Sequence, residues 1–167
     1  MRKLNILKAI IDFLWIFSTP LILLFIGFAV MVFFVDLSGL DIKINAITFN
    51  KNHLLTKILF SIAALNYLLI IAALYYFKKT LSYFIRVKVF EDVVINSFQK
   101  TGNLLFISGV ISLVISFIGN IYLLQKTTFE LGLNQHIVII CLGLFFMVLS
   151  EIFKIAKNAK QENDLTI

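Results

Sequence analysis

The chain has 167 residues, of which 60% are hydrophobic and 14% are charged, and its formal net charge is +6. Soluble globular domains are about 45–50% apolar and about 25% charged, so this composition excludes an ordinary soluble domain and favours a bilayer as the solvent. The single cysteine, Cys141, excludes a disulfide within the chain. The length suits one domain over residues 1–167, which we expect to be an all-α, polytopic membrane protein.

The first half of the chain contains two apolar runs that can cross a bilayer as helices, because about 20 residues span the hydrocarbon core. The first run is 13–35, which carries no charge, and the second is 54–77. A cleaved signal peptide is the rival interpretation of the first run, but the run is longer than a typical signal. We expect Pro20 to bend the first helix and the hydroxyls beside it to bind the carbonyl that it frees.

The polar segment that separates these two runs covers residues 36–53. Apolar and polar side chains roughly alternate from Asp41 to Asn50, a pattern typical of a short extended segment. An irregular loop is the alternative interpretation, and the pattern does not decide between them.

The most basic segment away from the ends runs from Lys78 to Asn103, and we call it the elbow. Apolar residues keep helical spacing into it, and Glu91 and Asp92 suit a first helical turn. We therefore expect the second helix to extend about two turns beyond the membrane and the third to begin near Glu91. The third and fourth spans, 104–124 and 137–156, complete an up-down bundle of four transmembrane helices.

Lysine and arginine are unevenly distributed around these spans. The N-terminal tail, the elbow and the C-terminal segment hold 11 of them, whereas the other two loops with their span ends hold 4. The positive-inside rule then predicts a multi-pass protein of the cell membrane with both termini and the elbow in the cytoplasm. There the basic residues would meet the anionic headgroups of the lipid bilayer, so we expect no direct binding of nucleic acid.

One face of the third span carries small polar residues at i, i+4 and i+8, namely Ser108, Ser112 and Ser116. Small residues at this spacing let helices approach closely and hydrogen-bond across the contact. We therefore predict helix packing here, within the bundle or in a homo-oligomer. A polar transport path is the alternative.

Glu151 is the most deeply placed acidic residue of the fourth span. A carboxylate there is costly to desolvate, so we expect a compensating cation or simple solvation. Lys154 lies one turn away and is the plain structural partner. Arg86 or Lys88 of the elbow is the alternative, and that pair would tie the elbow to the fourth helix. The candidate interaction site for a cytoplasmic protein consists of Glu151, Arg86, Lys88 and Phe90.

Catalytic motifs are missing from the sequence, which has no H-E-x-x-H, P-loop, G-x-S-x-G or C-x-x-C. We therefore expect neither an enzyme nor a bound cofactor or metal. His53 and His136 both stand where spans begin, and metal binding or pH sensing is the alternative to an ordinary interfacial role. The expected function is that of a regulatory or partner-binding membrane protein, and a small transporter or lipid-binding protein is the alternative.

Three segments of the chain resemble a known family. The elbow reads V-F-E-D-x(5)-F-x-K-x-G-N-L, residues 149–153 read L-S-E-I-F, and the chain ends in E-N-D-L-T-I. The matching elbow residues are Phe90, Phe98, Gly102 and Leu104. They resemble the bacterial membrane family called domain of unknown function 2975. The resemblance covers nearly the whole chain and implies a four-span inner-membrane protein with no established activity. Members are often encoded beside small helix-turn-helix regulators, which implies such a regulator as a partner.

Overall fold

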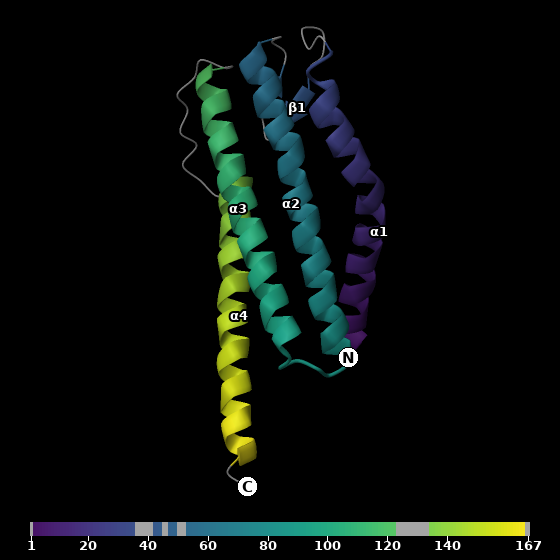
Figure 1. Ribbon diagram of the computed structural model, residues 1–167, viewed down its shortest axis with the longest axis vertical. Helices are drawn as coiled ribbons and strands as arrows, with labels where there is room; N and C mark the ends of the chain where they lie inside the picture. Colours follow the sequence, from purple (N-terminus) through teal and green to yellow (C-terminus); the bar gives the residue numbers. More distant parts are fainter. Residues whose placement is uncertain (1, 36–41, 45–46, 50–52, 123–133, 166–167) are drawn as a thin grey trace.

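The computed structural model describes residues 2–35, 42–44, 47–49, 53–122 and 134–165. Four long helices dominate it: α1 (Arg2–Met31), α2 (Leu54–Ile85), α3 (Asp92–Tyr122) and α4 (Gln135–Leu165). They run up and down beside one another (Figure 1). Each helix is long and apolar enough to cross a membrane. The prediction of a multi-pass protein with four helical spans is therefore confirmed.

The helices are longer than the predicted spans at the end of the molecule that holds both termini (Figure 1). The first begins at Arg2 instead of residue 13, and the last continues to Leu165 instead of ending at residue 156. The second ends at Ile85 and the third begins at Asp92, so both predicted helical extensions of the elbow are confirmed. At the opposite end, residues 123–124 of the third predicted span lie outside the described residues.

Each helix packs mainly against its neighbour in the sequence. The contact between α3 and α4 is the most extensive, followed by that between α2 and α3 and then that between α1 and α2. In Figure 1, α1 therefore lies at one edge of the molecule and touches the remainder chiefly through α2.

A short antiparallel hairpin connects α1 to α2, made of β1 (Ile42–Ile44) and β2 (Ile47–Phe49). Ile42 pairs with Phe49, and Ile44 pairs with Ile47. The extended segment predicted from the alternating pattern is thus present, and the structure adds that it folds back on itself.

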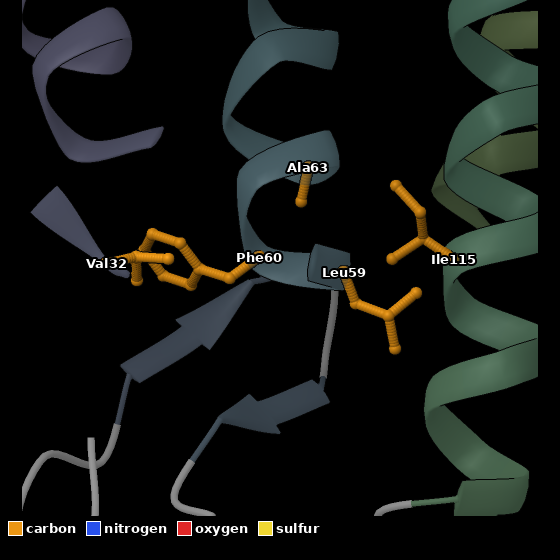
Figure 2. Packing of buried hydrophobic residues seen from close by; sticks show 5 residues of the cluster. All are labelled: Val32, Leu59, Phe60, Ala63 and Ile115. Carbon is orange, nitrogen blue, oxygen red and sulfur yellow. The ribbon is translucent and has the colours of Figure 1, made fainter. Parts of the chain in front are cut away.

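A cluster of buried apolar residues lies near this hairpin (Figure 2). Val32, just beyond α1, packs with Phe60, while Leu59 and Ala63 point toward Ile115 of α3. One cluster thus joins the first three helices at the end of the molecule opposite the termini.

Helix α1 continues without interruption through Pro20. Proline cannot donate to the carbonyl four residues before it, which here belongs to Ile16. The neighbouring hydroxyls do not bind that carbonyl: Ser18 and Thr19 both donate to the carbonyl of Trp15, over 2.8 Å and 3.0 Å. The prediction that these hydroxyls bind the freed carbonyl is therefore wrong. They bind the carbonyl of Trp15, one residue before Ile16, because that is the carbonyl within their reach.

Glycines allow the backbones of α3 and α4 to come into direct contact. A Cβ atom added at Gly143 would lie 2.6 Å from the backbone nitrogen of Phe106, and one at Gly102 would lie 2.7 Å from the carbonyl oxygen of Gly143. At Gly109 a Cβ would lie 2.6 Å from the side chain of Ile140. At Gly102 and Gly143 the nearest atoms include backbone, so a larger residue there would move the helices apart.

Candidate functional site

Most of the charged side chains in the described residues gather at one end of the helices, which we call the basic end. It contains the start of α1, the connection between α2 and α3, and the end of α4 (Figure 1). All of the predicted interaction residues, Arg86, Lys88, Phe90 and Glu151, lie in this half of the molecule.

The connection between α2 and α3 contains a strained residue. Val87 has φ of 60°, in the left-handed region that a β-branched side chain rarely adopts. Its backbone N–H donates to the carbonyl of Phe84, and that of Lys88 donates to the carbonyl of Tyr83. This pair of bonds is the Schellman pattern that closes a helix, in which glycine usually takes the left-handed position. Valine there costs about 1–2 kcal/mol.

An aromatic cluster ties the elbow to α4. The ring of Phe98 lies 5.8 Å from that of Phe84 and 5.4 Å from that of Phe153, and Phe90 lies 6.4 Å from Phe153. Phe146 extends the cluster toward the membrane, 5.9 Å from Phe98. Phe84 is half-buried in this cluster, whereas Phe90 belongs to the predicted interaction site. Phe90 is the more exposed of the two.

Ion pairs connect the start of α3 with its surroundings. Lys157 of α4 lies 2.6 Å from Asp92, and Lys88 lies 3.2 Å from Glu91. The ammonium group of Lys160 lies 5.8 Å from the ring centre of Phe90. The elbow is thus held to α4 through Asp92 and Phe90, and Lys88 is engaged within the elbow.

A polar groove runs between α3 and α4 at the basic end, with a volume of about 440 Å³. Its lining is mostly polar and carries both signs of charge. The residues that line it are Asp92, Ile95, Asn96, Gln99, Ser150, Glu151, Lys154, Lys157, Asn158 and Gln161.

Glu151 lines this groove and is exposed, so its carboxylate is not desolvated by protein. Among the residues that the structure describes, no lysine or arginine lies within 4.0 Å of it. Neither Arg86 nor Lys88 forms the predicted bridge, although Lys154 lines the same groove. The structure therefore places Glu151 in a polar surface groove with a lysine nearby, which matches the simpler of the two expectations.

The predicted serine face meets α2. Asn66 Nδ2 donates to the carbonyl oxygen of Ser108 and to Oγ of Ser112, each over 3.1 Å. All three residues are buried, whereas Ser116 is half-buried. Asn66 was not predicted as a site residue. It is the one amide within the second span, and such a residue is a signal for an interhelical hydrogen bond.

The two histidines differ in their environment. His136 is buried at the start of α4, whereas His53 is exposed before α2. Within residues 2–35, 53–122 and 134–165, no three side chains of His, Cys, Asp or Glu gather as metal ligands would.

Two of the segments that carry the family resemblance, the elbow and residues 149–153, contact each other. Phe90 and Phe98 of the elbow contact Phe153, and Ser150 Oγ donates to the carbonyl of Ile95 over 2.8 Å.

Comparison with known proteins agrees with this resemblance. No curated protein and no solved structure matches the chain. The family model described as "Protein of unknown function (DUF2975)" matches residues 16–167, which is most of the length. The chain therefore belongs to this family of unknown function, and its own four apolar helices make it a multi-pass membrane protein.

Proposed function

We propose that this is a non-enzymatic regulatory membrane protein that binds a soluble cytoplasmic protein in the polar groove between α3 and α4. The observation that carries the proposal is the lining of that groove. Glu151, Lys154 and Asn158 offer a carboxylate, an ammonium and an amide over two turns of one helix, with Asn96 and Gln99 opposite. Groups of both charges can pair with a polar helix of a partner, whereas lipid chains or an apolar substrate would leave them unpaired.

The elbow supports the same proposal. Strained backbone positions persist where the surrounding structure holds them, and they are typical of segments that change conformation. Val87 is such a position, and Asp92 and Phe90 link the elbow to the α4 side of the groove. A partner that binds the groove would therefore also act on the elbow. The family resemblance adds a small helix-turn-helix regulator as the kind of partner.

Site-specific photo-crosslinking in intact cells tests this proposal. A photoreactive amino acid at Asn158, which lines the groove, should crosslink a soluble protein. The same amino acid at Val148, an exposed apolar position on α4 about three turns before Asn158, should not. Charge reversal by Glu151→Lys should lower the yield at Asn158 several-fold, because it removes the single acidic group on the α4 wall.

Two results would contradict the proposal. One is a folded chain that gives no crosslink at Asn158 or at Asn96 across the groove. The other is a crosslink at Val148 as strong as that at Asn158, since contact would then not be specific to the groove.

A second candidate function is the binding or transport of a small apolar molecule. It is favoured by an apolar pocket of about 470 Å³ to which all four helices contribute, including Phe17, Leu74, Leu105 and Leu142. Uptake of an apolar compound by vesicles that contain the chain would favour this second function over the first.

A further inference from the structure

An apolar groove of about 400 Å³ lies between α1 and α2 and reaches the basic end. Its lining is Trp15, Ile22, Leu68, Ile71, Ala72, Tyr75 and Tyr76. The ring centre of Tyr75 lies 5.2 Å from that of Trp15 and 5.5 Å from that of Tyr76. Tryptophan and tyrosine gather where hydrocarbon gives way to headgroups, so one end of this groove lies in hydrocarbon and the other meets the polar region.

Two lysines stand over these aromatic rings. The Nζ atom of Lys78 lies 5.8 Å from the ring centre of Trp15, and that of Lys100 lies 5.0 Å from the ring centre of Tyr76. Lys79 is exposed, and it follows the two tyrosines at the i+3 and i+4 spacing that places residues on one face of a helix.

The charges at this end of the groove do not cancel. Asp12 lies 3.4 Å from Lys78 and 4.0 Å from Lys8. Among the described residues, it is the acidic residue that pairs with these two lysines. Lys79 and Lys100 form no ion pair with the described residues, so their charges are available to a ligand.

We infer that this groove is a binding site for an anionic phospholipid of the bilayer. One acyl chain lies along the apolar wall formed by Ile22, Leu68 and Ala72, and the phosphate lies between Lys79 and Lys100. Lysine binds phosphate as a point charge, and a basic site beside an apolar groove selects an anionic lipid over a zwitterionic one. A second copy of the chain is a less favourable occupant of this groove, because the lysines of the two copies would lie close together and repel each other.

The inference does not depend on the proposed function, because its apolar groove lies between α1 and α2 and not between α3 and α4. The chain contains one tryptophan, and it lines this groove. Fluorescence of Trp15 therefore reports directly on the lipid beside it. The full chain is placed in mixed micelles, and phosphatidylglycerol or phosphatidylcholine with brominated acyl chains is added as the quencher.

Each lysine near the headgroups contributes about a fivefold preference for an anionic lipid. We expect brominated phosphatidylglycerol to quench Trp15 at a mole fraction roughly 25-fold lower than brominated phosphatidylcholine does. Lys79→Gln and Lys100→Gln should each reduce that preference about fivefold, and the double variant should abolish it. Lys3→Gln removes the same charge from an exposed position near the start of α1 and should leave the preference unchanged.

Three results overturn the inference. The first is equal quenching by the two lipids in the native chain. The second is a preference that Lys3→Gln lowers as much as Lys100→Gln does, since the lysines would then act only through overall charge. The third is loss of the preference when inorganic phosphate is added at the concentration of the lipid, which would assign the lysines to a free anion. If circular dichroism shows that the double variant is unfolded, the two single variants carry the comparison.

Discussion

The two outer helices are attached to the molecule in different ways. Helix α4 meets α3 through Gly102, Gly109 and Gly143, so that backbone lies against backbone. Helix α1 meets α2 through side chains, such as the ring of Phe25, which stacks at 5.1 Å on that of Tyr67. The contact between α3 and α4 is also more extensive than that between α1 and α2. A long apolar sequence is therefore enough to cross the membrane, but only small residues produce a tight contact with a neighbouring helix.

The difference has a physical basis. Lipid chains are as apolar as leucine side chains, so burial of apolar surface does not drive helices together within a bilayer. Close packing and hydrogen bonds must do so instead. The glycine contact provides the packing, and Ser150 adds a hydrogen bond to the carbonyl of Ile95. We therefore expect α3 and α4 to behave as one unit and α1 to separate from it more readily.

The largest expected effect comes from a methyl group added at the glycine contact. Gly143→Ala would place Cβ 2.6 Å from the backbone of Phe106, so the helices must separate. Overpacking of this kind costs about 1–3 kcal/mol, which would appear in the free energy of unfolding measured by SDS titration. Gly27→Ala on α1 is the matched control, because nothing lies within 4 Å of the new methyl.

Gly27→Ala should leave stability unchanged or raise it by about 1 kcal/mol, the difference in helix propensity between the two residues. If Gly143→Ala is as well tolerated as Gly27→Ala, the contact between α3 and α4 is not the tight one, and the comparison of the two outer helices fails.

Two serines sharpen the comparison, because each donates one hydrogen bond across a different contact. Ser150 bonds α4 to the carbonyl of Ile95 over 2.8 Å, and Ser61 bonds α2 to the carbonyl of Ala29 over 2.9 Å. Such bonds within membranes are worth about 0.6 kcal/mol on average, so replacement of either serine by alanine should cost a similar amount.

The two serine variants should differ in the helices whose backbone amides exchange hydrogen faster than in the native chain. Ser61→Ala should speed exchange mainly in α1, which has few other contacts, whereas Ser150→Ala should affect α3 and α4 together. Mass spectrometry of the exchanged peptides measures this. Faster exchange throughout the molecule for Ser61→Ala would mean that α1 unfolds with the rest.

The smallest effects should come from the ion pairs at the basic end. Lys157 lies 2.6 Å from Asp92, but the side chain of Asp92 is 74% exposed. Lys78 lies 3.4 Å from Asp12, whose side chain is 34% exposed. Ion pairs in contact with water contribute about 0–1 kcal/mol and are screened by salt.

Asp92→Asn and Asp12→Asn should therefore each lower the free energy of unfolding by less than about 1 kcal/mol, and high salt should remove most of the difference. A loss of several kcal/mol that persists in salt would show that charge, and not packing, holds the corresponding helix.

Much of the architecture follows from local sequence patterns. The four spans are long, mostly apolar runs, and helical spacing carries the second and third helices into the elbow up to Ile85 and from Asp92. The pair of Lys88 and Glu91 has i, i+3 spacing and was also within reach of sequence reasoning. These features depend on residues that are close in the chain.

Features that depend on distant residues were not predicted. Nothing in the sequence says that Gly102 meets Gly143, or that Asp92 pairs with Lys157, because both depend on the register between two helices. The left-handed Val87 was missed for another reason. Valine is among the least suited residues for that conformation, so propensity points away from it.

The length of α4 has a mechanical consequence. The predicted apolar run ends at Ala156, yet the helix continues to Leu165, so we expect its last turns to project beyond the hydrocarbon. From Gly143, where it crosses α3, to Leu165 the helix measures roughly 33 Å. Helices tilt when the bilayer becomes thinner. Because α4 is bound to α3 along this length, the two helices would tilt together, and a tilt of roughly 10° would move the end of α4 by roughly 6 Å. A change in membrane thickness would therefore displace the elbow and the end of α4 together.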